Sequence, residues 1–172
     1  MSLKNEADLL TWLPSIPIFG GLEETTLKRV IKLLGVHQFQ PEAEICKQGE
    51  SGRAMFLVRD GEVVVCRDNE EGRRSKLVRM GPGEFFGEMT LIDIQKRSAT
   101  VVAQKQSLLF SLSNRDLYCL YQEDVPGYVI VLQNICRELS RRLRVTNHRL
   151  QTMASEHDDD EHTLIRPAVK RS

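Results

Sequence analysis

Residues 81–101 hold side chains suited to binding an anion. Gly81, Gly83 and Gly87 allow sharp turns and let a ligand approach the backbone closely. The residues after Gly87 fit one short helical turn, whose first N–H groups would be free to face an anion. Arg97 would add a forked, permanently charged donor for a phosphate oxygen. This segment therefore predicts a phosphate site.

Glu88 indicates what else the ligand carries. An ionised carboxylate only accepts hydrogen bonds, and it repels a phosphate. It suits a ligand in which a hydroxyl lies beside the phosphate, as the 2'-OH of a ribose does. Glu88 and Arg97 together therefore predict a sugar phosphate.

Two other interpretations compete for the same residues. Glu88 and Arg97 could form an exposed ion pair in a surface loop, which would contribute little to stability. The glycines could belong to a dinucleotide fingerprint, but their spacing misses that pattern by one residue and no alternating strands and helices surround them. We reject the fingerprint and keep the surface pair as the alternative.

The segment resembles the phosphate-binding cassette of cyclic-nucleotide-binding domains, the family of the catabolite activator protein and the regulatory subunit of cAMP-dependent protein kinase. The matching runs are FGEMTLI at 86–92 and RSATV at 97–101. The resemblance implies that Glu88 holds the ribose 2'-OH and that Arg97 holds the cyclic phosphate. The cassette residues expected nearby are Gly87, Met89, Thr90 and Ser98.

Two cassette positions depart from the family pattern. Thr90 stands where Ala, Ser or Gly is usual, and it could crowd the phosphate. Lys96 stands where the kinase subunits have proline. A hydroxyl at the position of Ser98 touches phosphate in one branch of the family and guanine in another. The expected ligand is therefore cAMP, with cGMP as an alternative.

Composition excludes several classes of function. Lysine plus arginine equal aspartate plus glutamate at 24 each, so no bulk charge attracts nucleic acid or anionic lipid. No apolar run approaches the about 20 residues that cross a bilayer, and no secretion signal opens the chain. We expect a cytoplasmic protein without membrane contact. The four cysteines, Cys46, Cys66, Cys119 and Cys136, form no C-x-x-C pair and are predicted to be buried thiols rather than metal ligands.

Residues 1–35 are predicted to form an N-terminal helical segment. Leu27, Val30, Ile31 and Leu34 recur at helical spacing. The helix is expected to start near Glu23 or Thr25 and to stop at Gly35.

Residues 36–124 change to short apolar or alternating runs that predict strands. Asp60-Gly61 predicts a two-residue hairpin, and residues 69–72 predict a longer hairpin loop. Many short strands indicate a small barrel or roll. The family resemblance implies a mainly β fold, an eight-stranded β jelly roll with flanking helices. The predicted strands are Val36–Phe39, Glu44–Cys46, Met55–Arg59, Glu62–Arg67, Lys76–Met80, Ala99–Ala103 and Leu108–Leu112.

Residues 125–154 are predicted to form one long helix with Pro126 in its first turn. A short helix capped by Ser113 is predicted before it. Its apolar positions alternate in steps of four and three, the pattern of two helices that pair along their length. A homodimer through residues 132–153 is expected, although such a helix could also lie on its own barrel. We expect the early turns on the barrel and the later turns across a two-fold axis. The repeat consists of Leu132, Cys136, Leu139, Leu143, Thr146, Leu150 and Met153.

Residues 141–147 on this helix also resemble the central helix of the catabolite activator protein. The resemblance implies that Thr146 meets the adenine amino group and that Asn147 reaches ligand in the other subunit. It also implies that Arg142 meets the cassette glutamate. Thr146 could instead only set the register of the dimer.

Residues 155–172 are predicted to be a disordered tail. The His and acidic residues at 156–162 could attract a metal, but nothing orients them as ligands, so a solvated tail is the preferred interpretation. The tail is too short for a helix-turn-helix domain, and direct DNA binding is not expected.

The sequence thus predicts a receptor module, with no catalytic residue and no cofactor, that binds a cyclic nucleotide and signals through its C-terminal helix to an unknown protein partner. Two alternatives stay open. A degenerate domain could act as a ligand-free interaction scaffold, and a cupin-like metal enzyme would share the roll. The four histidines fall in unrelated segments, which disfavours the enzyme.

Overall fold

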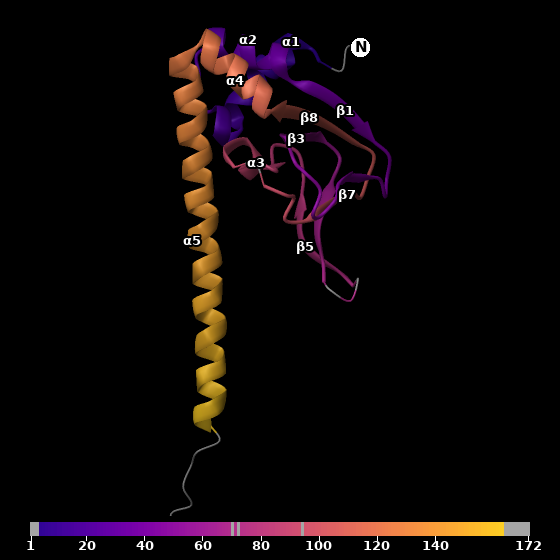
Figure 1. Ribbon diagram of the computed structural model, residues 1–172, viewed down its shortest axis with the longest axis vertical. Helices are drawn as coiled ribbons and strands as arrows, with labels where there is room; N and C mark the ends of the chain where they lie inside the picture. The colour runs from indigo at the N-terminus through magenta and orange to yellow at the C-terminus, as the bar shows by residue number, and fades with distance from the viewer. Residues whose placement is uncertain (1–3, 70, 72, 94, 164–172) are drawn as a thin grey trace, which may run out of the picture. The chain divides into compact units, whose positions relative to one another are not determined.

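The computed structural model describes residues 4–69, 71, 73–93 and 95–163. The chain divides into two units, residues 1–134 and residues 135–172. The first unit contains a β roll and its flanking helices, and the second contains most of one long helix (Figure 1).

Two four-stranded antiparallel sheets form the roll (Figure 1). One sheet has the order β1-β8-β3-β6 and the other has the order β2-β7-β4-β5. The predicted eight-stranded jelly roll with flanking helices is therefore confirmed. The strands are β1 (Gly35–Phe39), β2 (Glu44–Cys46), β3 (Ala54–Asp60), β4 (Val63–Asp68), β5 (Arg74–Met80), β6 (Phe85–Phe86), β7 (Thr100–Ala103) and β8 (Ser107–Ser113).

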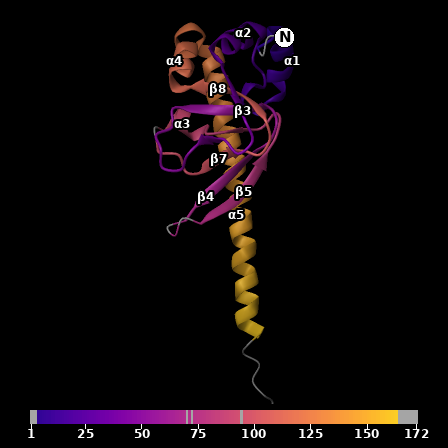
Figure 2. The same ribbon diagram turned by 90° about the vertical axis from the view of Figure 1, so that its right-hand side faces the viewer.

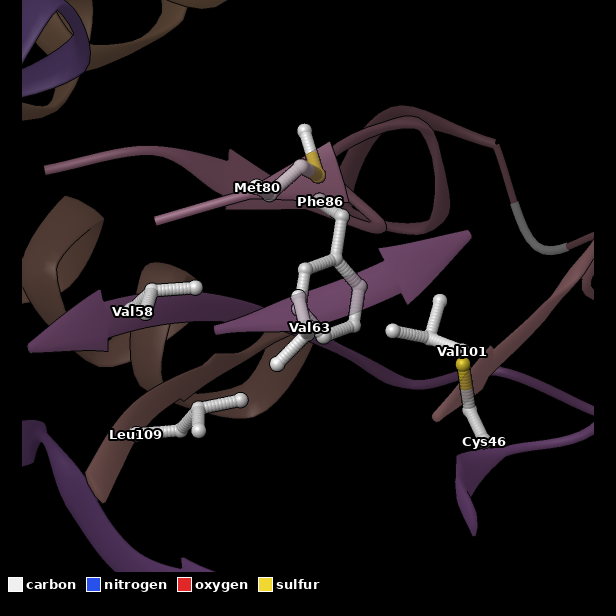
Figure 3. Close-up of a cluster of buried hydrophobic side chains, with 7 residues drawn as sticks. All are labelled: Cys46, Val58, Val63, Met80, Phe86, Val101 and Leu109. Atoms are coloured by element: carbon white, nitrogen blue, oxygen red, sulfur yellow. The ribbon is translucent and has the colours of Figure 1, made fainter. Parts of the chain in front are cut away.

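The core lies between the two sheets, and Figure 3 shows seven side chains that meet there. Each comes from a different strand, so both sheets contribute to one apolar cluster. Full burial of such a side chain stabilises the fold by about 1.5 to 3 kcal/mol. The cluster consists of Cys46, Val58, Val63, Met80, Phe86, Val101 and Leu109.

Strand β6 was not predicted from the sequence, because two residues are too few to show a period. It pairs with β3, where Phe86 lies opposite Phe56. Both of its residues are buried, and the ring of Phe86 points into the apolar cluster (Figure 3). This anchor fixes the chain immediately before Gly87.

The predicted hairpin at Asp60-Gly61 is wrong. Strands β3 and β4 lie in different sheets and do not pair, so these residues carry the chain from one sheet to the other. Gly61 does have the positive φ of 91° that the sequence predicts for a turn. By contrast, β4 and β5 pair as the predicted longer hairpin, and the N–H of Asn69 donates to the carbonyl of Arg73 (3.0 Å). Residues 70 and 72 of that loop lie outside the described residues.

The N-terminal helices α1 (Glu6–Trp12), η1 (Leu13–Ser15), η2 (Pro17–Phe19) and α2 (Glu24–Leu33) pack at one end of the roll (Figures 1 and 2). Glu23 is the N-cap of α2, as predicted. Gly35 is not the helix stop, because α2 ends at Leu33 and Gly35 opens β1. A Cβ atom at Gly35 would lie 2.5 Å from Ser111 Oγ on β8, so close strand approach explains this glycine.

Helix α4 (Asn114–Glu123) follows β8 directly. Ser113 caps it as predicted: its Oγ accepts from the N–H of Asp116 (3.2 Å), and its own N–H donates to the Asp116 carboxylate (2.8 Å). Helix α5 (Val125–Thr163) begins where expected, with Pro126 in its first turn. It continues past residue 154 into the segment predicted as a tail, and residues 164–172 of that tail lie outside the described part of the chain.

Asp124 joins α2 to the start of α5 within the first unit. Its Oδ2 accepts from Thr26 Oγ1 (2.5 Å) and Arg29 Nη1 (3.0 Å), and its Oδ1 accepts from the N–H of Gly127 (3.0 Å). The hydrogen bond from Thr26 is the largest of the causes that lower the pKa of Asp124, followed by the bond from Gly127. A Cβ atom at Gly127 would overlap the Thr26 side chain, so α2 packs closely there. Asp124 is thus a charged link between three segments.

We expect Asp124→Asn to lower the free energy of unfolding by about 1 to 2 kcal/mol near neutral pH, because its charge-assisted hydrogen bonds are weakened. The folded-state pKa lies below the ordinary value of 3.8, so the carboxylate stabilises the fold above that pH. This contribution disappears as the pH falls through the lowered pKa. Urea unfolding of parent and variant should therefore converge in acid. Asp93→Asn, at an exposed carboxylate, is the control, and an equal loss there would contradict the assignment.

Candidate functional site

The central part of the cassette begins where β6 ends. Gly87 follows Phe86 with a φ of 76°, a left-handed conformation that favours glycine. The short helix α3 (Met89–Ile92) comes next, and Glu88 is its N-cap. The chain then turns back, and Lys96 forms an isolated bridge with Ser51. The resembling segment is thus a turn, one helical turn and a returning loop.

Glu88 and Arg97 are both buried, with exposed fractions of 4% and 9%. Charged side chains are almost never this buried unless they are paired or bind something. The interpretation of these two residues as an exposed surface pair therefore does not fit the structure.

The guanidinium of Arg97 is only partly satisfied by protein. Its Nη2 donates to the carbonyl of Ala54 (2.7 Å), and the group lies 5.8 Å from the centre of the Phe56 ring. Its Nε and Nη1 are buried and have no hydrogen-bond partner among the described residues. A buried donor without a partner costs free energy, more so when it is charged. These two nitrogens are charged donors that an anionic ligand could satisfy.

The backbone of Arg97 is held on both sides by the loop before β3. Its N–H donates to the carbonyl of Glu50 (2.8 Å), and its carbonyl accepts from the N–H of Gly49 (2.8 Å). The loop fixes the arginine before any ligand arrives. Pre-organisation of this kind lowers the entropy lost on binding.

Two glycines make room for the guanidinium. A Cβ atom at Gly52 would lie 2.6 Å from Arg97 Nε, and one at Gly87 would overlap Arg97 Nη1. The sequence did not identify Gly52 as part of this site, so its role beside Arg97 was missed. Its place in the glycine-containing run 49–52 is the signal available in the sequence.

Thr90 is buried, and its hydroxyl donates to the carbonyl of Gly87 (2.8 Å). Its methyl group lies on the side of Gly52, where a Cβ atom would approach it to 2.8 Å. The prediction that the first N–H groups of this helical turn are free is wrong in part. The N–H groups of Thr90 and Leu91 donate to the carbonyls of Gly87 and Glu88 (3.2 and 3.0 Å), because the short turn closes on itself.

The structure brings Gly87, Glu88, Thr90 and Arg97 into one turn-and-loop segment. Met89 and Ser98 belong to the same segment and have exposed side chains.

The remaining candidates, Arg142, Thr146 and Asn147, lie on α5 in the second unit. There Arg142 Nε donates to Glu138 Oε1 (2.8 Å), and the Thr146 hydroxyl donates to the carbonyl of Arg142 (3.0 Å). The hydroxyl in the apolar repeat therefore has a partner within its own helix.

Other kinds of site find little support. No group of three or more His, Cys, Asp or Glu residues that could hold a metal ion occurs among the residues with described side chains, and the tail at 156–162 lies outside them. Cys46 and Cys66 are buried as predicted, whereas Cys136 is exposed, so that part of the prediction is wrong. Burial is the main cause that raises the pKa of the Cys46 thiol. In the same part of the chain, no helix has the length and apolar character needed to span a membrane.

Known proteins resemble this chain in sequence, among them a receptor protein and a channel. The cyclic AMP receptor protein of Thermus thermophilus is 32% identical over 140 residues, which cover 81% of this chain and 63% of that protein. A cyclic nucleotide-gated potassium channel of Mesorhizobium japonicum is 38% identical over 106 residues, which cover 62% of this chain and 28% of the channel. The chain thus spans less than two thirds of either relative.

Solved structures agree with the roll. The catabolite activator protein of Thermus thermophilus has a TM-score of 0.72 at 32% identity, over 80% of this chain and 63% of that one. A cyclic nucleotide-binding domain from Methylobacillus flagellatus has a TM-score of 0.76 at 24% identity, over 88% and 85% of the two chains, which supports the fold alone. The family model of the cyclic nucleotide-binding domain matches residues 36–124. This chain therefore belongs to the family of cyclic nucleotide-binding domains.

Proposed function

We propose that this protein is a regulatory sensor that binds cAMP, with cGMP as the second candidate, and that it signals occupancy through α5. The observation that carries the proposal is the buried guanidinium of Arg97, which has two nitrogens without partners among the described residues. A cyclic phosphate carries two exocyclic oxygens, either of which can accept from such a charged donor. No catalytic step is assigned to the chain.

The phosphate would lie against Arg97, whose guanidinium occupies the space that Gly52 and Gly87 leave. Arginine suits this role because its planar group is always charged and donates in a fixed geometry. The buried setting strengthens the attraction, since the local dielectric constant is lower than in water. The relatives named for cyclic AMP and cyclic nucleotides support the same ligand class.

The ribose would lie against Glu88, whose ionised carboxylate can only accept a hydrogen bond. The 2'-OH of the ribose is a donor that fits this acceptor. In the observed geometry the Thr90 hydroxyl would not donate to the phosphate, because it already donates to the carbonyl of Gly87. Ser98 has an exposed hydroxyl that could serve a phosphate or a guanine, which keeps cGMP in consideration.

The base would be read by α5. By resemblance to the family, Thr146 would meet the adenine amino group, Asn147 would reach ligand in a second subunit, and Arg142 would meet the cassette glutamate. A ligand shifts a conformational equilibrium only through contacts that differ between the two states. Contacts that form only with nucleotide present would therefore constitute the signal. The rival role of Thr146, setting dimer register, is compatible with its hydrogen bond inside the helix.

A homodimer through residues 132–153 is part of the proposal. Within the described part of α5, Leu143 and Leu150 expose 60% and 59% of their surface. They fall in the repeat of fours and threes, where a second helix would cover them. A scaffold without ligand would use the same helix, so ligand binding and dimerisation need separate tests.

Calorimetric titration with cAMP, cGMP and AMP tests the ligand. We expect cAMP to bind, AMP to bind far more weakly, and Arg97→Ala to lose about 2 to 5 kcal/mol of cAMP binding, because the bound phosphate loses its buried partner. Arg73→Ala, at an exposed arginine of the β4–β5 loop, should leave affinity unchanged. Equal cAMP affinity in parent and Arg97→Ala would overturn the phosphate assignment. Lack of binding to the parent would favour the scaffold.

A double comparison tests the ribose contact. We expect Glu88→Gln to weaken cAMP binding by about 1.5 to 3 kcal/mol, the usual size of a hydrogen bond to a charged group. The same substitution should matter little for 2'-deoxy-cAMP, which lacks the donor. Calorimetry with both ligands separates this contact from general damage to the cassette. Equal losses for the two nucleotides would show that Glu88 does not bind the 2'-OH.

Sedimentation at micromolar concentration tests the dimer. The parent is expected to sediment as two chains, and Leu139→Asp with Leu143→Asp as one, because each pair would bury uncompensated charges. Arg144→Asp with His148→Asp places the same residues outside the repeat and should leave the dimer intact. A monomeric parent would contradict the prediction.

A further inference from the structure

The side chain of Asn114 connects the site around Arg97 to helix α4. Its Nδ2 donates to the carbonyl of Thr90 in α3 (2.7 Å), and its backbone N–H donates to the carbonyl of Arg53 (3.0 Å). Asn114 is also the first residue of α4. One residue therefore ties the start of this helix to the cassette turn and to the segment before β3.

These two segments are the ones that hold the guanidinium. Arg53 precedes Ala54, whose carbonyl accepts from Arg97 Nη2. Thr90 donates to the carbonyl of Gly87, the glycine that leaves room for Arg97 Nη1. The contacts thus form a closed ring that runs from Arg97 through both segments to Asn114. A movement of the guanidinium would change both attachments of Asn114.

The amide of Asn114 is held in one orientation. A flipped amide would put its oxygen against the carbonyl of Thr90, and two acceptors repel each other. In the observed orientation, Oδ1 is buried and has no hydrogen-bond partner among the described residues. A buried acceptor without a partner needs a physical explanation. Asn114 thus donates to the cassette while its own acceptor stays without a partner among the described residues. This points to the contact with the cassette as the role of the Asn114 side chain.

The other end of α4 leads to further helices. Asp124 follows α4 and accepts hydrogen bonds from Thr26 and Arg29 of α2 and from Gly127 of α5. Asn114 and Asp124 are therefore the polar attachments at the two ends of one helix. A displacement at the first would be passed to α2 and to the first turns of α5, all within residues 4–134.

We propose that Asn114 is the positioning residue that transmits phosphate occupancy at Arg97 to helix α4. The proposal rests on the proposed function, since it requires a phosphate at Arg97. A phosphate that accepts from Nε or Nη1 of the guanidinium draws this group toward itself and competes with the carbonyl of Ala54. The segments at 53–54 and 87–90 then shift together, and α4 follows through the two hydrogen bonds of Asn114.

Hydrogen exchange of the full chain, with and without saturating cAMP, measures this transmission. In the parent, cAMP should slow exchange in residues 87–98 and change exchange in residues 114–123. In Asn114→Asp, which cannot donate to the carbonyl of Thr90, the cassette should still be protected while the change in α4 is lost. Affinity should fall by no more than about 2- to 10-fold, as expected for one hydrogen bond. Gln122→Ala, on the exposed surface of α4, should behave as the parent.

Asn114→Ala is the second variant. An acid in the first turn suits a helix N-terminus, so Asn114→Asp should fold even where Asn114→Ala does not. A parent-like response of α4 in a folded variant would overturn the proposal, and so would loss of folding in both variants, which would make Asn114 a structural residue. A parent whose cassette is protected by cAMP while α4 stays unchanged would also overturn it. A parent without protection of the cassette would instead refute cAMP binding itself.

Discussion

The burial of the Arg97 charge is the constraint on which the rest of the site depends. Moving a guanidinium out of water is costly, and one carbonyl and one aromatic ring offset only part of that cost. The remaining donors, Nε and Nη1, are buried and have no hydrogen-bond partner among the described residues. Such an arrangement persists only where the surrounding structure enforces it. The contacts around Arg97 hold its guanidinium in this buried position.

Those contacts begin in the apolar core. Phe86 belongs to the buried cluster and stacks on Phe56 with ring centres 5.4 Å apart. Phe56 in turn faces the guanidinium of Arg97. The two-residue strand β6 therefore links the apolar core between the sheets, through Phe86 and Phe56, to the guanidinium of Arg97. A core that fixes β6 also fixes Gly87, and with it the space beside Arg97.

Local patterns in the sequence predicted the strands and the cassette, but contacts between distant segments could not be read from them. Alternation identified seven strands, while β6 was too short to show it. Asp60-Gly61 has the chemistry of a hairpin, yet whether neighbouring strands share a sheet is decided by the whole roll. Glu88 and Arg97 were predicted as site residues because their types and spacing match a motif. The carbonyl of Ala54 was missed because every residue has a backbone carbonyl, so the residue type gives no sign of its role. The amide of Asn114 was missed because a single asparagine at this position resembles an ordinary residue at a helix terminus.

A comparison of two arginines shows why burial, rather than residue type, marks the site. Arg74 on the β4–β5 hairpin donates to Asp68 (2.7 Å) and Glu44 (3.0 Å), and its side chain is well exposed. Those carboxylates raise the pKa of Arg74, with Asp68 the larger cause, and water screens the exposed pairs so that they contribute little. Arg97 has the same side chain, but its Nη2 donates to a backbone carbonyl, its other two nitrogens have no hydrogen-bond partner among the described residues, and it is shielded from water. Arg74 already has carboxylate partners, so an anion that left water to bind it would replace an existing interaction and add no new one. An anion at Arg97 would supply what the protein itself leaves out, so ligand binding and the stability of this region are linked.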